Sequence, residues 1–124
     1  MRAWLQKHDL SSEEFEIPDA SNAKKILGEF DWQGELSRQL QTTSETCDPG
    51  LGLVTDDGDI LHICPGTCGR CMVHFHFSDT RRVFGLFSRK VDLLKTFRDV
   101  SLYRVHQMID AFFVHDFERI KHMA

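Results

Sequence analysis

Cysteine and histidine are concentrated in residues 62–76, which read HICPGTCGRCMVHFH. This segment holds three of the four cysteines and three of the seven histidines of the chain. Thiolates and imidazoles are the ligands that tetrahedral zinc takes in proteins, and the Pro-Gly-Thr-Cys-Gly turn would let several of them converge. A structural zinc is therefore one hypothesis for this segment. Its ligands would be Cys64, Cys68, Cys71 and His74, with His62, His76 and Cys47 as further candidates.

The cysteine spacing leaves two other interpretations open. Zinc fingers and ribbons usually carry two separated ligand pairs, whereas Cys68-Gly-Arg-Cys71 is the single C-x-x-C pair of this chain. In the first of these interpretations no metal is bound, and the thiols and imidazoles are free groups on a polar strand face. A redox pair is the remaining interpretation. Such pairs gain a low thiol pKa from a helix N-terminus, but this pair precedes a predicted strand.

An antiparallel β-meander is expected to position these side chains. Residues 51–55 and 60–64 form two strands joined by Asp57-Gly58, a turn sequence that tight hairpins favour. Residues 72–77 alternate apolar and imidazole side chains, and residues 82–87 supply a fourth strand after a turn at 78–80. The buried positions predict the register of the second and third strands, because pairs on one face must lie opposite each other. The expected pairs are Leu61–Phe75 and Ile63–Val73 on the buried face, and His62–His74 and Ile60–His76 on the other.

Short helices are expected before this meander and one long helix after it. Ser11 or Ser12 is a plausible helix start, and Asp19 or Ser21 is a plausible cap for a second helix. From Ser88 onward, apolar residues recur at helical spacing. The predicted fold is α+β in one domain. It has a helical acidic part at 1–46, a four-stranded antiparallel β-meander at 51–87 and a helical part at 88–123, whose long carboxy-terminal helix packs on the sheet.

Charge is distributed unevenly along the chain. Residues 1–60 hold 13 acidic against 5 basic side chains, and residues 61–124 hold 6 against 10. An acidic first half disfavours nucleic-acid binding there and favours docking to a basic protein, with electrostatic steering of the encounter. A solvated acidic surface with no partner is the plainer interpretation of the same numbers.

Motifs of enzymes and of membrane insertion are missing from the sequence. We find no GxSxG, no phosphate-binding glycine loop and no HExxH, so a non-enzymatic role is expected. No apolar run is long enough to span a membrane, and the amino terminus lacks the apolar region of a secretory signal. A cytoplasmic protein with reduced cysteines is therefore expected.

Two alternative functions remain open. The first is a metal-dependent enzyme or regulator, in which the cluster at 62–76 holds a metal with an open coordination position. The second is nucleic-acid binding through residues 81–90, because Arg81-Arg82-Val-Phe-Gly-Leu-Phe-Ser-Arg89-Lys90 interleaves basic and aromatic side chains on an expected strand.

In its organisation the chain resembles the small cytosolic immunity proteins of bacterial toxin systems. The shared features are the acidic helical start, the hairpin GLVTDDGDI at 52–60 and the sequence SRKVDLL at 88–94 before a terminal helix. The resemblance implies a non-enzymatic inhibitor that binds and neutralises a toxin, and a basic toxin would complement the acidic first half. The expected docking residues are Glu13, Glu14, Glu16, Asp19, Glu29, Asp31 and Glu35.

Overall fold

The structure is a computed structural model that describes residues 1–83 and 87–123, without the side chains of 79–90. Within these ranges, six strands form one antiparallel sheet with the spatial order β2-β1-β3-β4-β5-β6. The helices and strands follow the chain in this order: β1 (Arg2–Gln6), β2 (Ser12–Glu16), α1 (Ala20–Glu29), α2 (Trp32–Gln41), β3 (Gly50–Val54), β4 (Ile60–Pro65), β5 (Cys71–Val83), β6 (Phe87–Val100), α3 (Leu102–Phe113) and α4 (Phe117–Lys121).

The α+β class is as predicted, but the four-stranded meander with a long carboxy-terminal helix is wrong. Residues 2–16 form the hairpin of β1 and β2 rather than a helix, and residues 87–100 form β6. Buried residues alternate along β1, which is the period of a strand. In β6, the spacing of Val91, Leu94 and Phe97 imitates a helical stripe, but this segment pairs with β5 along its length.

Other expectations are confirmed. The hairpin of β3 and β4 forms as predicted, and all four predicted pairs between β4 and β5 are present. Asp19 caps α1 by accepting a hydrogen bond from the Asn22 amide at 2.9 Å. The predicted long carboxy-terminal helix, by contrast, is replaced by two shorter ones, α3, which begins at Leu102 after the cap residue Ser101, and α4.

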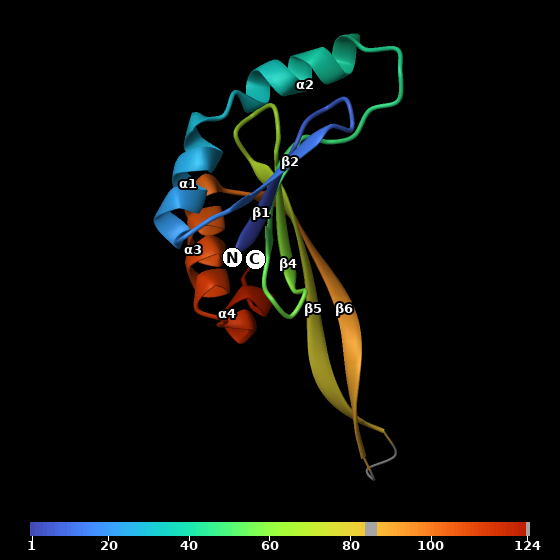
Figure 1. The fold of residues 1–124 in the computed structure, drawn as a ribbon, viewed down its shortest axis with the longest axis vertical. Helices are drawn as coiled ribbons and strands as arrows, with labels where there is room; N and C mark the ends of the chain where they lie inside the picture. Colours follow the sequence, from blue (N-terminus) through green and yellow to red (C-terminus); the bar gives the residue numbers. More distant parts are fainter. Residues whose placement is uncertain (84–86, 124) are drawn as a thin grey trace.

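Helices α1, α3 and α4 lie on one side of the sheet (Figure 1). The hydrophobic core lies between these helices and the sheet. The core includes alternate strand residues such as Leu53, Leu61 and Phe75, all fully buried. Phe75 contacts Phe112 of α3 edge-on, with ring centroids 6.2 Å apart. The other side of the sheet carries no helix in Figure 1, and we call it the open face.

Strands β5 and β6 continue beyond the rest of the sheet. Strand β4 pairs with β5 only as far as His76, whereas β5 and β6 remain paired to Val83 and Phe87. The two strands therefore leave the sheet as a two-stranded arm, which extends away from the helices in Figure 1.

Candidate functional site

The open face holds a different set of side chains from the helix-covered face. Antiparallel partners point to the same side of a sheet, so the register shows which residues share this face. One row of such partners crosses all six described strands. Its members, from edge to edge, are Glu14, Trp4, Gly52, His62, His74 and Thr96. We call this set the open row.

Trp4 occupies its place in the open row because residue 52 is a glycine. A Cβ atom at Gly52 would lie 2.2 Å from each of three atoms in the six-membered ring of Trp4. A point equally far from three atoms of a ring lies on the axis of that ring, so one face of the indole rests on Gly52. Any larger residue at position 52 would displace the tryptophan.

His62 lies beside Trp4, with ring centroids 5.3 Å apart, and its other neighbour in the row is His74 at 5.9 Å. Burial, together with the nearby His74 and His76, lowers the pKa of His62 to about 4. Its Nε2 atom lies 3.7 Å from the Cys64 sulfur. A Cβ at Gly50 would approach the same two atoms to 2.8 and 3.1 Å, so Gly50 also makes room on this face. His62 is therefore a neutral, packed side chain near pH 7.

The predicted zinc ligands are divided between different places. His62, Cys64, His74 and His76 occupy alternate positions on the open face, whereas Cys71 packs in the core and Cys68 is exposed in the β4–β5 turn. The Nδ1 atom of His74 and the hydroxyl of Thr96 form a hydrogen bond of 3.1 Å. Cys47 donates from its sulfur to the Lys7 carbonyl at 3.2 Å.

Three of these cysteines still line one pocket of about 290 Å³ at the β4–β5 turn, together with Met72 and Asp48. Burial raises the pKa of Cys64 to about 12 and also raises that of Cys71. Both thiols are therefore protonated at neutral pH and poor nucleophiles. In the part of the chain that the structure describes, no group of three or more His, Cys, Asp or Glu side chains is placed to hold a metal ion. The zinc site stays a prediction.

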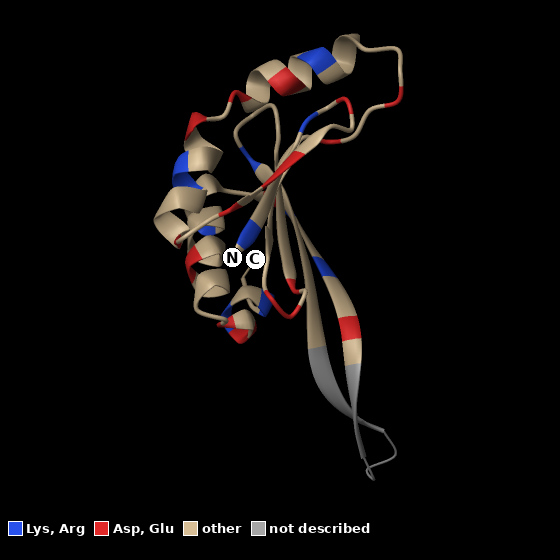
Figure 2. Cartoon of the chain, viewed as in Figure 1, with Lys and Arg blue, Asp and Glu red and all other residues tan. Residues whose placement is uncertain are grey.

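The expected docking residues are also divided. Glu13, Glu14 and Glu16 are exposed on β2, a strand at the edge of the sheet, where acidic residues appear in red in Figure 2. Asp19 and Asp31 accept hydrogen bonds from the first-turn amides of α1 and α2, so they are helix caps. Glu29 is exposed near the end of α1.

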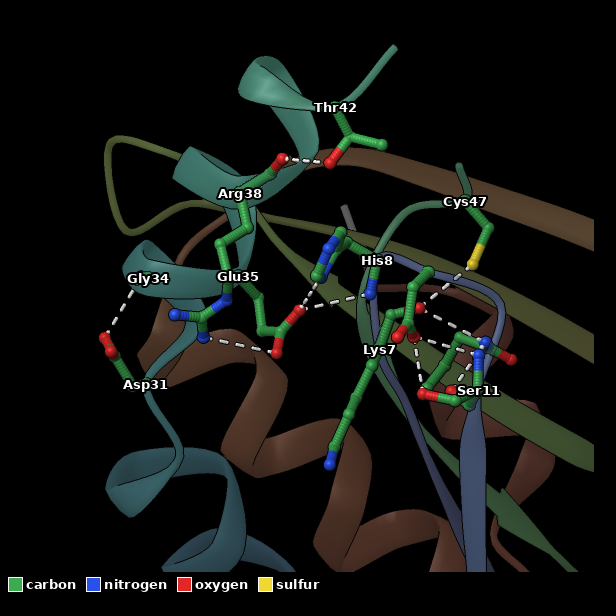
Figure 3. A network of polar contacts seen from close by, with 11 residues as sticks. Lys7, His8, Ser11, Asp31, Gly34, Glu35, Arg38, Thr42 and Cys47 are labelled. Carbon is green, nitrogen blue, oxygen red and sulfur yellow. Dashed lines mark hydrogen bonds and ion pairs between the residues drawn. The ribbon is translucent and has the colours of Figure 1, made fainter. Parts of the chain in front are cut away.

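Glu35 belongs to an internal network instead of the surface (Figure 3). It is buried, and its Oε2 accepts hydrogen bonds from the His8 amide at 3.1 Å and from the His8 ring. Arg38 donates to its Oε1 at 3.3 Å. Burial raises the pKa of Glu35, but the hydrogen bonds from His8 and Arg38 outweigh burial and hold it below its usual value. Through its hydrogen bonds with His8, the Glu35 carboxylate therefore links α2 to the turn after β1.

The basic segment proposed for nucleic-acid binding lies in the arm. The backbone register places Arg81 opposite Arg89 and Arg82 opposite Ser88. The side chains of residues 81–90 lie outside the described part of the structure, and so do residues 84–86 as a whole. Nucleic-acid binding through Arg81–Lys90 stays a prediction.

Comparisons with known proteins give no neighbour: no family model, no curated protein and no solved structure matches this chain. The resemblance to immunity proteins thus gains no support from them. None of the helices in the described ranges has the length and apolar character to cross a membrane.

The sequence analysis missed Trp4 and Gly52 as site residues, because only the strand register brings them together.

Proposed function

We propose that this protein is a binding module whose acidic edge strand and open face dock to a basic protein. The observation that carries the proposal is the position of β2. It lies at the edge of the sheet, and it presents Glu13, Glu14 and Glu16 to solvent, with Glu14 in the open row, Glu16 on the same face and Glu13 on the other face.

These carboxylates are largely unneutralised. Among the described residues, Glu13 and Glu14 form no ion pair, and Glu16 lies 3.6 Å from the amino-terminal ammonium group. An edge strand also offers unpaired backbone donors and acceptors that another chain can use. Acidic side chains on that edge repel acidic proteins and attract basic ones, so they select the partner and speed its association.

The more specific form of this proposal is an immunity-type inhibitor. In that role the protein binds a basic toxin and blocks its activity at a one-to-one ratio. Three features support it: the acidic edge, the sheet face that carries no helix, and the protonated thiols of Cys64 and Cys71, which are poor nucleophiles.

The test is an affinity capture with matched baits, followed by measurements on the purified partner. The test bait carries Glu13→Lys, Glu14→Lys and Glu16→Lys. The control bait carries Glu45→Lys, Asp56→Lys and Asp57→Lys, which change the net charge equally at exposed positions outside β2. Each partner that the wild-type bait holds is then purified, whether or not the two variant baits retain it.

For each purified partner, association rates are measured at several ionic strengths. The proposal predicts that reversal on β2 slows association about tenfold or more at low salt and flattens the salt dependence. Equal effects of the two triple variants would show that β2 is not the docking site. If the partner has a toxic activity, equimolar wild-type protein should abolish it.

A further inference from the structure

Trp4 of the open row directs one face of its indole ring away from the sheet. The inner face of the Trp4 ring rests on Gly52. This contact fixes the plane of the ring, so the opposite face points away from the sheet. Trp4 is half-buried, whereas Trp32, the other tryptophan, is buried and donates its Nε1 hydrogen to the Leu27 carbonyl. The only ring that contacts Trp4 among the described residues is His62, tilted by 40° at its side.

Glu14 stands directly opposite Trp4 in the pairing of β1 and β2. Side chains in this relation share a face, with Cβ atoms about 5 Å apart. Glu14 is exposed and has no ion-pair partner among the described residues. Its neighbour Glu16 differs, because Glu16 lies opposite Arg2 and near the amino-terminal ammonium. Of the two carboxylates that β2 places on the open face, the uncompensated one is thus the one beside the tryptophan.

A rigid aromatic face next to a free carboxylate is suited to a cation. The π face attracts a positive group electrostatically, and tryptophan is the strongest of the aromatic side chains in this respect. Guanidinium groups fit best, since they are planar, stack on aromatic rings and bind carboxylates through two parallel hydrogen bonds. No cation lies over the Trp4 ring in the described part of the structure.

We propose that Trp4 and Glu14 form a receptor for an arginine side chain of the basic partner, stacked on the indole and paired with the carboxylate. This inference rests on the proposed function, because it names the central contact of that docking surface. Gly52 is the positioning residue, since it holds the indole flat. Buried arginine and tryptophan contacts are those that dominate binding energy in protein interfaces.

The receptor is tested with hexa-arginine as the probe. Binding is followed by calorimetry and by tryptophan fluorescence in wild-type protein and in Trp4→Phe, which retains Trp32. We expect a saturable change of the Trp4 signal that Trp4→Phe lacks, and tighter binding of hexa-arginine than of hexa-lysine. Equal affinity for the two peptides, or an unchanged Trp4 signal, would overturn the proposal.

A matched pair of isosteric variants separates the receptor from general acidic attraction. Glu14→Gln should weaken hexa-arginine binding about fivefold. Glu13→Gln, one residue away and opposite Leu5 on the other face, should change it less than about twofold. Circular dichroism checks that both variants fold. Equal losses in the two variants, or stronger binding of a single-stranded oligonucleotide than of hexa-arginine, would contradict the receptor.

The same variants distinguish this proposal from the one on which it rests. If the triple reversal on β2 slows association with the captured partner but Glu14→Gln does not, the docking surface stands and the receptor fails. If hexa-arginine binds at Trp4 while the triple reversal leaves the partner's association unchanged, the docking surface fails and the cation site stands. Loss in both experiments supports both proposals.

Discussion

The two faces of the sheet are built from the same strands but have different contents. The helix-covered face carries Leu51, Leu61 and Phe75, all fully buried, whereas the open face carries Gly52, His62 and His74 at the intervening positions. Burial of apolar area explains the first set. The second set consists of two imidazoles and a glycine that leaves room for Trp4, and burial of apolar area does not explain it. The comparison therefore places stability on one face and leaves the other for the recognition that we propose.

A truncation on each face tests this division most strongly. Phe75→Ala removes a fully buried ring that contacts Phe77, Phe112 and Phe117, so it should lower the free energy of unfolding by about 3–5 kcal/mol. His74→Ala, the next residue on the same strand, should cost less than about 1 kcal/mol. Urea unfolding monitored by circular dichroism measures both. Similar losses would show that the open face is also a core.

His62 sharpens the comparison, because it is a packed residue on the open face. Its pKa is about 4 in the folded state and close to 6.5 when unfolded. Between these values the unfolded chain takes up a proton and the folded one does not, so stability falls as pH drops from about 6.5 to 4. The full loss is about 3 kcal/mol.

Unfolding free energies at pH 7 and pH 4.5 measure this dependence. His62→Gln should remove the part of the fall in unfolding free energy that protonation of His62 causes. His76→Gln, at an exposed position on the same face, serves as the control. An unchanged pH dependence in His62→Gln would mean that this imidazole is accessible to protons in the folded protein.

Glu35 provides a third test, at the end of the sheet where α2 is attached. Glu35→Gln removes the charge that accepts hydrogen bonds from His8 and Arg38, and the expected cost is about 2 kcal/mol at pH 7. Because the pKa of Glu35 is lowered on folding, this stabilisation is present above about pH 4.5 and is lost as the pH falls further. Arg38→Gln, which removes one exposed partner, should cost less than about 1 kcal/mol. Equal losses would contradict a central role for the carboxylate.

The smallest change in unfolding free energy is expected for a substitution of Leu10. It lies exposed in the turn between β1 and β2 with a φ of 72°, a conformation that side chains other than glycine rarely adopt. Leu10→Gly should therefore raise the unfolding free energy by about 0.5–1 kcal/mol. Thermal unfolding checks the sign. A loss of stability would show that the leucine side chain contributes packing to this end of the sheet.

The sequence predicted those parts of the fold in which local pattern and final environment agree. Strands β4 and β5 alternate clearly, so the predicted pairing of His62 with His74 is correct. Strand β2, with the sequence SEEFE, has a composition that also suits a helix start, and its pairing with β1 decides its structure. Strand β6 carries apolar residues at a spacing of three, and only its long-range partner β5 makes it a strand.

The candidate site was only partly visible in the sequence. The concentration of cysteine and histidine at 62–76 drew attention to the correct strands, but alternate residues on a strand point to opposite faces. Cys71 and His74 are separated for this reason. The contact of Trp4 with Gly52 joins distant parts of the chain, and no local pattern encodes such a pair.

The accessibility of Trp4 tests the central claim most directly, because an uncovered open face underlies both proposals. Acrylamide quenching of tryptophan fluorescence is compared between the wild type and Trp4→Phe, whose remaining Trp32 is buried. The account predicts that the wild type contains a component quenched several-fold more strongly than Trp32, absent from Trp4→Phe and independent of protein concentration. A wild-type protein quenched as weakly as Trp4→Phe would mean that the open face is covered in solution, and would contradict the account.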